Sequence, residues 1–321
     1  MEMEKMVLGI DIGGTYTKLG LVDRNGNIMG TKVFSTGSKG SYADFISKLK
    51  KELDLLLGMD GSTCEIMAVG IGAPNSNIHT GQMEDAPNFN WGPRVPLQKS
   101  ITDICGLPTT IANDANAAAM GELVFGMAKG MQNFVVLTLG TGLGSGIIID
   151  GRLFTGHNGM AGELGHVNVD PYGRKCNCGL RGCLENYASV TGLKRTVFEL
   201  ISEMKEDSPL RRLSFEALTG EMISEAANAG DAIALKAFQL TGKVLGRKLA
   251  DTAAHLDPEA YILAGGLGKA GKLLLKPTME SMEKNLFIAY RGKIKVAIST
   301  AASSILGPAA LAMQSLEDHH S

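Results

Sequence analysis

The chain contains two copies of one pattern, and this duplication constrains the fold more than any other feature. The stretch "MVLGIDIGGTYTKLGLVDRNGNI", which begins at Met6, has an apolar strand, a Gly/Thr turn, a second apolar strand and a hairpin turn that contains aspartate. The stretch "NFVVLTLGTGLGSGIIIDGRLF" (Asn133–Phe154) has the same order of features. The copies lie roughly 130 residues apart, which predicts the duplication of a domain-sized unit.

The rest of the chain alternates strand and helix patterns, which predicts an α/β protein. We place a domain boundary near Asn113–Asp114, where the helix before the second copy begins. This gives a smaller N-terminal α/β domain (1–115 plus 303–321) and a larger C-terminal one (116–302), and we expect the last helix to pack back on the first domain. Strands are expected at 7–12, 18–23, 65–74, 260–266 and 294–300, and helices at 45–56, 189–206, 219–228, 231–256 and after 303.

Composition excludes several classes of protein. Hydrophobic residues make up 44% of the chain, charged residues 20%, and the net charge is −2. Such a balance offers no basic surface for nucleic acid. No apolar run is long enough for a membrane span, and the N-terminal stretch lacks the features of a signal peptide. We therefore expect a cytoplasmic protein that binds neither membrane nor nucleic acid.

The two glycine turns are candidate phosphate sites. Backbone N–H groups of glycines can approach phosphate oxygens closely, and Asp11 at a strand end could hold a hydrated Mg²⁺. Neither turn is a P-loop or a Rossmann fingerprint, and ligand-free hairpins remain the alternative. Two such loops in a duplicated chain favour phosphates clamped between two domains. The candidates are Asp11, Gly13, Gly14, Thr15 and Lys18 in the first copy, and Thr138, Gly140, Thr141 and Gly142 in the second.

Two further junctions between a strand and a helix carry candidate residues. In "IANDANAAAMGE", Asp114 could accept a proton from a substrate hydroxyl, whereas spacing alone favours a helix cap at Asn113 and Asp114. In "LAGGLGKAGKLL", Gly265 and Gly266 precede a helix whose N-terminus could face a nucleotide, although this signal is weak alone.

Three of the five cysteines lie in one loop that a histidine precedes. His166, Cys176, Cys178 and Cys183 have the spacing H-x9-C-x-C-x4-C, which satisfies tetrahedral Zn²⁺. Free thiols in a flexible loop are the alternative. Four protein ligands leave no position for water, so we expect a structural zinc. The same loop carries Glu163 and Glu185, which the zinc would hold in place for a polyol, and the second nitrogen of the histidine could bind a ligand.

These motifs together resemble the ROK family of bacterial sugar kinases and repressors. The resemblance covers essentially the whole chain, and its most specific strings are "GELGHVNVD" and "CNCGLRGCLENYAS". It implies the duplicated actin-like ATPase (ribonuclease H-like) fold, with two α/β domains and an interdomain cleft. It also implies ATP, Mg²⁺ and structural Zn²⁺ as cofactors, and family members are commonly homodimers.

The resemblance also assigns roles to individual residues. Asp114 resembles the catalytic base that accepts the proton of the sugar 6-hydroxyl. Gly265 and Gly266 resemble the adenosine segment, and the two glycine turns resemble the phosphate segments. The zinc set is His166, Cys176, Cys178 and Cys183. The positions that resemble hexose ligands are Asn88, Asn113, Asp114, Glu163, His166 and Glu185.

The implied activity is a glucokinase, which transfers the γ-phosphoryl group of ATP to the 6-hydroxyl of glucose. Kinases for N-acetylmannosamine or N-acetylglucosamine are the alternative, followed by fructokinase and a non-catalytic sugar sensor. A repressor would normally carry an N-terminal winged helix, and the first phosphate strand begins near residue 6, so we expect none. One departure bears on the sugar pocket, because Asn75 stands where most members have glycine.

Overall fold

The computed structural model describes residues 4–59, 64–301 and 303–318 and divides into two compact units. The first unit comprises the described residues of 1–130, 153–161 and 301–321. The second comprises 131–152 and 162–300. In the described part of the chain, no helix is both long and apolar enough for a bilayer crossing.

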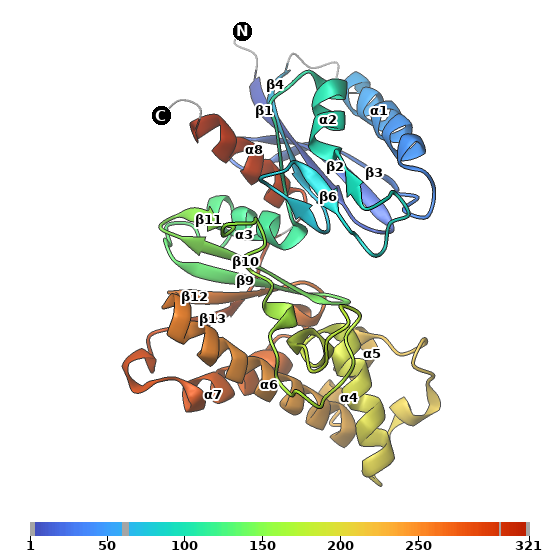
Figure 1. Ribbon diagram of the computed structural model, residues 1–321. Helices are drawn as coiled ribbons and strands as arrows, with labels where there is room; N and C mark the ends of the chain where they lie inside the picture. Colours follow the sequence, from blue (N-terminus) through green and yellow to red (C-terminus); the bar gives the residue numbers. More distant parts are fainter. Residues whose placement is uncertain (1–3, 60–63, 302, 319–321) are drawn as a thin grey trace. The chain divides into compact units, whose positions relative to one another are not determined.

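A five-stranded sheet forms the centre of the first unit (Figure 1). The strand order is β3-β2-β1-β4-β8, with antiparallel pairing among the first three strands and parallel pairing of β1, β4 and β8. The strands are β1 (Glu4–Ile12), β2 (Tyr16–Asp23), β3 (Ile28–Ser35), β4 (Cys64–Gly72) and β8 (Thr109–Ala112). A separate small sheet consists of β5 (Ser76–Asn77), β6 (Gln82–Glu84) and β7 (Arg94–Val95).

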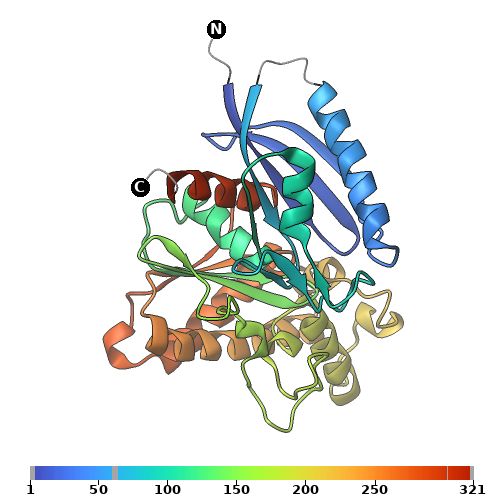
Figure 2. The same cartoon turned by 45° about the horizontal axis from the view of Figure 1, so that its top comes forward.

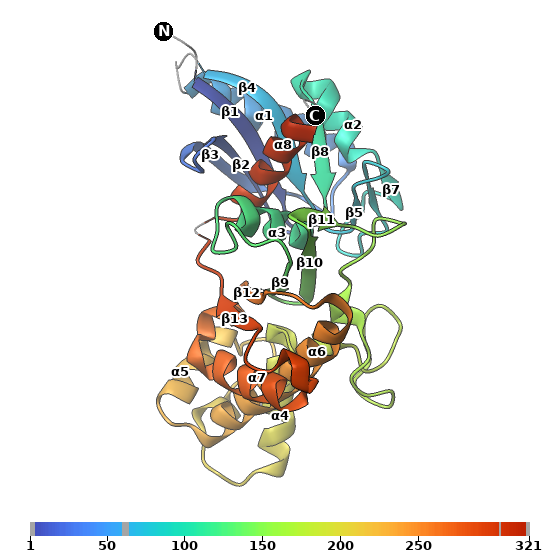
Figure 3. The same ribbon diagram turned by 90° about the vertical axis from the view of Figure 1, so that its left-hand side faces the viewer.

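Helices cover both faces of the first sheet. On one face, α1 (Tyr42–Met59) and α2 (Leu97–Cys105) bury Phe45, Leu49 and Leu97 against β1 and its neighbours (Figure 2). On the other face lies α8 (Leu306–Asp318), which also packs on α3 (Asp114–Val124) (Figure 3). The alternation along β1 explains this division, since successive side chains of a strand point to opposite faces.

The second unit repeats the topology of the first. Its sheet has the order β11-β10-β9-β12-β13, with β10 antiparallel to β9 and with β9, β12 and β13 parallel. The predicted duplicated α/β fold is therefore confirmed. The strands are β9 (Phe134–Leu139), β10 (Leu143–Ile149), β11 (Arg152–Phe154), β12 (Ala260–Ala264) and β13 (Lys295–Ile298).

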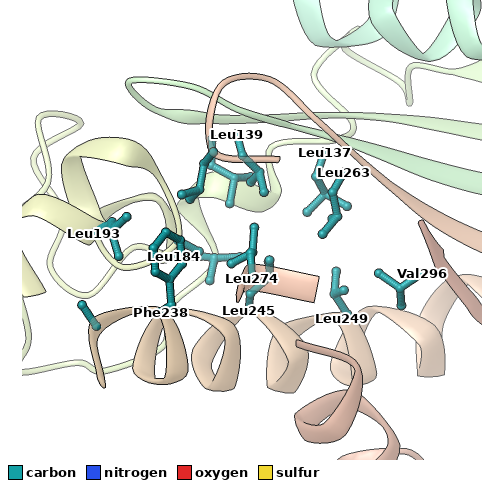
Figure 4. Packing of buried hydrophobic residues seen from close by; sticks show 14 of the residues in the cluster. Leu137, Leu139, Leu184, Leu193, Phe238, Leu245, Leu249, Leu263, Leu274 and Val296 are labelled. Atoms are coloured by element: carbon teal, nitrogen blue, oxygen red, sulfur yellow. The ribbon is translucent and has the colours of Figure 1, made fainter. Parts of the chain in front are cut away.

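Four long helices complete the second unit. Figure 4 shows side chains of β9 and β12, such as Leu137 and Leu263, above the apolar face of α6, which contributes Phe238, Leu245 and Leu249. Burying one such side chain contributes about 1.5–3 kcal/mol, so this layer is the main source of stability in the unit. The helices are α4 (Val190–Glu203), α5 (Gly220–Asn228), α6 (Ala232–Leu256) and α7 (Lys272–Asn285).

Glycines allow α8 to lie directly on the first sheet. A methyl group at Gly70 would stand 1.8 Å from the carbonyl oxygen of Pro308, and one at Gly9 would stand 2.7 Å from that of Ile305. Neither carbonyl can retreat without moving the helix backbone. The helix therefore sits at a distance from the sheet that larger residues at Gly9 and Gly70 would not permit.

This contact gives the first prediction. Gly70→Ala is expected to lower the free energy of unfolding by at least about 2 kcal/mol, because α8 must shift away from the sheet. Urea unfolding of both proteins measures the difference. Gly58→Ala is the matched control, because a methyl group there meets no atom within 4 Å, and it is expected to leave stability unchanged or raise it. Equal effects of the two substitutions would contradict the close packing of α8.

Candidate active site and metal centre

The predicted residues of the first unit gather at one edge of its sheet. Asp11 is paired with Gly72 across β1 and β4, and Gly72 is paired with Ala112 across β4 and β8. These three residues form one row, and adjacent strands are about 4.8 Å apart, so Asp11 and Ala112 are separated by roughly 10 Å. Asn113 and Asp114 follow directly. Because parallel strands end at the same edge, the sheet brings the candidate phosphate turn (Gly13–Thr15) close to Asp114, the candidate base.

Hydrogen bonds to the backbone fix the turn from Gly13 to Thr15. Its backbone closes with a hydrogen bond from Gly13 N to Tyr16 O, and Thr36 Oγ1 donates to Gly13 O at 2.7 Å. The buried hydroxyls of Thr36 and Thr17 are 2.9 Å apart. Gly14 and Thr15 themselves are exposed, so they are open to a ligand while their backbone is fixed.

Asp11 and Lys18 meet through a third residue. Ser304 Oγ donates to Asp11 Oδ2 at 2.5 Å, and Lys18 Nζ donates to Ser304 Oγ at 3.1 Å. Burial raises the pKa of the Asp11 carboxyl, and the Ser304 hydrogen bond and the nearby Lys18 charge oppose that rise. Sequence reasoning missed Ser304, because 293 positions separate it from Asp11 and no local pattern links them.

The sequence offers two interpretations of Asn113 and Asp114, a helix cap and a carboxylate that accepts a proton. Asn113 is the N-cap of α3, and its Oδ1 accepts from Ala115 N at 2.9 Å. Asp114 is the first residue of the helix, and its side chain is exposed. Asp114 Oδ1 also accepts from Ala115 N, at 2.8 Å, so both side chains contribute to the cap, and the exposed carboxylate of Asp114 lies at the sheet edge.

Asn88 and Asn75 lie in the loops beside this edge. The Cβ of Asn88 is 4.0 Å from the position that a Cβ on Gly14 would take, so Asn88 neighbours the phosphate turn. Asn75 has a φ of 50°, which is a conformation that glycine and asparagine tolerate best. Its side chain donates to Asp85 O at 3.2 Å. Asn75 therefore meets the same backbone requirement as the glycine that is usual here, while adding an amide.

In the second unit, the glycine turn and the cysteine loop touch. Thr138 lies on β9, and Gly140 N donates to Gly142 O at 3.0 Å to close the turn that contains Thr141. Glu185 Oε2 accepts from Leu143 N at 3.2 Å, and a Cβ at Gly142 would lie only 2.2 Å from that carboxylate oxygen. The absence of a side chain at Gly142 thus lets Glu185 approach the turn.

The four predicted metal ligands converge. The ligand atoms of His166, Cys176, Cys178 and Cys183 lie within 4.8 Å of one another. Cys176 Sγ lies 3.9 Å from His166 Nδ1, and Cys178 Sγ lies 3.7 Å from Cys183 Sγ. Ligands of tetrahedral zinc are about 3.5–3.8 Å apart, so the cluster fits this ion. Burial raises the pKa of the Cys183 thiol to about 12, so a bound cation must displace its proton.

The histidine connects this cluster to the candidate sugar ligands. Because Nδ1 of His166 faces the cysteines, Nε2 points away and lies 3.9 Å from Glu163 Oε2. Glu185 Oε1 is 3.6 Å from Cys176 Sγ. The cysteine loop therefore places Glu163, His166 and Glu185 in one neighbourhood.

Two residues that sequence reasoning missed hold this loop in place. Arg174 donates to the backbone oxygens of Asn186 and Gly192 at 2.6 and 3.1 Å and pairs with Glu199 of α4. The buried Ser145 of β10 donates to Gly162 O and accepts from Leu164 N. A single arginine in a loop or a single serine in a strand has no distinctive spacing, and only the fold reveals its partners.

A small cavity of about 200 Å³ lies beside Gly266. A single face of α5 lines it with polar side chains, and Leu267 and Lys269 line the opposite side. Gly265 has a φ of 86°, and a Cβ there would lie 2.7 Å from Leu139 O, so glycine is required. The α5 residues that line the cavity are Glu221, Ser224, Glu225 and Asn228.

Comparisons with known proteins identify relatives that cover most of this chain. Over 284 residues the chain is 37% identical to a glucokinase of Halalkalibacterium halodurans, covering 87% of this chain and 86% of that protein. It is 30% identical to a xylose repressor of Caldicellulosiruptor bescii, over 91% of this chain and 74% of the repressor. A solved ROK glucokinase of Streptomyces griseus, in complex with glucose and AMPPNP, is 34% identical with a TM-score of 0.80, over 96% of this chain and 99% of that one.

These similarities confirm the actin-like ATPase fold that the resemblance implied. The sequence also matches the ROK family over residues 7–315, which is nearly the whole chain. The chain therefore belongs to the ROK family.

Proposed function

We propose that the protein is an ATP-dependent glucokinase, which transfers the γ-phosphoryl group of ATP to the 6-hydroxyl of glucose. The observation that carries this proposal is the row Asp11–Gly72–Ala112, which places the exposed Asp114 at the same sheet edge as a phosphate turn. The similarity to glucokinases at 37% identity supports it.

Asp114 is the proposed catalytic base. Its carboxylate accepts the proton of the 6-hydroxyl while that oxygen attacks the γ-phosphorus, and the bond from phosphorus to the leaving oxygen of ADP breaks. Phosphoryl transfer depends mainly on positioning and electrostatics, and the helix start gives the carboxylate a fixed place. The Asn113 cap fixes that helix start.

The two glycine turns are the proposed phosphate ligands. N–H and hydroxyl donors are available at Gly13, Gly14, Thr15, Thr141 and Gly142. Asp11 would hold Mg²⁺, which supplies charge neutralisation of the phosphates when bound. The cavity beside Gly266 has room for part of a nucleoside, and Glu221 and Glu225 could accept hydrogen bonds from ribose hydroxyls or an amino group.

The proposed hexose ligands carry hydrogen-bonding side chains. They are Asn88, Asn113, Asp114, Glu163, His166 and Glu185. Carboxylates, amides and an imidazole are the groups that distinguish sugar hydroxyls by their positions. Zinc on the cysteine loop would be structural, because all four of its coordination positions come from the protein. Homodimer formation and a cytoplasmic location stay predictions.

The substrate is tested by ADP release with ATP, Mg²⁺ and a panel of hexoses. Glucose is expected to give the highest kcat/KM among glucose, mannose, fructose, allose, N-acetylglucosamine and N-acetylmannosamine. A preference for an N-acetylated sugar would contradict glucose as the substrate but would agree with a sugar kinase. If no sugar stimulates ADP release, the kinase proposal is wrong and a sugar sensor is favoured. A test for sequence-specific DNA binding would then examine that alternative.

Asp114→Asn is expected to lower kcat by about 10³-fold, because general-base catalysis contributes on the order of 10²–10⁴. The melting temperature is expected to change little, since Asn also suits the first turn of a helix. Steady-state kinetics and thermal unfolding measure both effects. Asp103→Asn is the control, because Asp103 forms an exposed pair with Lys99 and lies on the surface of α2. Near-normal turnover of Asp114→Asn would rule out this residue as the base.

Metal content gives a further prediction. The purified protein is expected to contain one zinc per chain, and Cys178→Ala is expected to lose most of it with a lower melting temperature. Elemental analysis and thermal unfolding measure these quantities. Cys105→Ala is the matched control, because Cys105 lies outside the cluster, and it is expected to keep its zinc. Full zinc occupancy in Cys178→Ala would contradict the proposed ligand set.

A further inference from the structure

We propose that Ser304 is a positioning residue, which keeps Lys18 from forming a direct ion pair with Asp11 and so leaves the carboxylate able to serve Mg²⁺. This inference rests on the proposed function, since it concerns the same nucleotide site. It adds a residue that lies far from both glycine turns in the sequence.

The strand register brings the two charges together. Lys18 on β2 is directly opposite Asp11 on β1. Opposed residues of antiparallel strands have Cβ atoms about 4.5–5.5 Å apart, and opposite charges in such positions attract each other. A lysine side chain is long and flexible enough to reach a carboxylate at this distance. The sheet alone would therefore favour a direct pair between them.

The hydroxyl of Ser304 stands between them instead. It accepts from Lys18 Nζ at 3.1 Å and donates to Asp11 Oδ2 at 2.5 Å. Among the residues that the structure describes, these two charged groups form no ion pair with each other. A serine hydroxyl has one proton and two lone pairs, so a single group can satisfy both neighbours.

The start of α8 determines where Ser304 lies. Ile305 packs on Gly9, two residues before Asp11 on β1, with its carbonyl oxygen only 2.7 Å from where a Cβ on Gly9 would be. Ser303 accepts from Ile305 N at 3.3 Å, which helps to fix the turn before the helix. The contact of Ile305 with β1 therefore positions the Ser304 hydroxyl at the end of β1.

The arrangement leaves one oxygen of the Asp11 carboxylate available to a cation. The Ser304 hydrogen bond engages Oδ2 only, and the described residues include no hydrogen-bond donor to Oδ1. A direct pair with Lys18 would instead hold the carboxylate against an ammonium, in competition with a cation.

The test compares Ser304→Ala and Ser304→Thr with the wild type in the full chain. Binding of ADP is titrated by calorimetry at several Mg²⁺ concentrations, and the Mg²⁺ dependence of glucose phosphorylation is measured alongside. Ser304→Ala is expected to weaken Mg²⁺-dependent ADP binding about tenfold, as the loss of a hydrogen bond to a charged group predicts. The KM for glucose is expected to stay unchanged. Ser304→Thr keeps the hydroxyl and is expected to behave like the wild type.

A second variant tests whether Ser304 acts by keeping Lys18 away from Asp11 or only by stabilising the local structure. If Lys18 collapses onto Asp11 in Ser304→Ala, then adding Lys18→Met is expected to restore part of the Mg²⁺-dependent binding. Normal binding by Ser304→Ala, an equal loss in Ser304→Thr, or no recovery in the double variant would each overturn the proposal. If the wild type binds ADP with Mg²⁺ but phosphorylates no hexose, the proposed function fails while the calorimetry still decides the role of Ser304.

Discussion

The contact between α8 and the glycines of β1 and β4 is the constraint on which the first unit depends. Gly9 and Gly70 let the helix backbone approach the sheet so closely that its position along the strands is determined. That position carries Ser304 to Asp11 and closes the face of the sheet opposite α1 and α2. The packing of α8 therefore also determines the site geometry in this unit, because a shift of α8 would move the Ser304 hydroxyl relative to Asp11.

In the second unit, the cysteine loop has the corresponding role. The cluster of His166 with three thiols lies in a segment that has little regular structure of its own. Glu163 and Glu185 flank the ligands, and Glu185 also reaches the backbone of Leu143 beside the glycine turn. Arg174 then joins the loop to α4. Both units thus use a rigid feature next to a sheet edge to place flexible acidic side chains.

The sequence predicted those parts of the fold and site that depend on local patterns. Apolar runs before glycine turns identified β1 and β9, and the ligand types and spacing identified the metal cluster. The strands β5 to β7 and the helix α2 were not foreseen, because they are short and their apolar residues are few. Contacts between segments that are distant in the sequence give Ser304, Arg174 and Ser145 their roles. The spacing of residues along the chain does not predict such contacts. The backbone requirement at Asn75 became visible only through its positive φ.

The division of the chain has a consequence for its synthesis. The second unit is encoded almost entirely before residue 301, whereas the first unit needs residues 303–318 to cover one face of its sheet. During translation, which proceeds from the N-terminus, the first unit must wait with an exposed apolar face while the second is being made. The first unit is therefore completed after the second, and Asp11 acquires its serine partner only after residue 304 has been made.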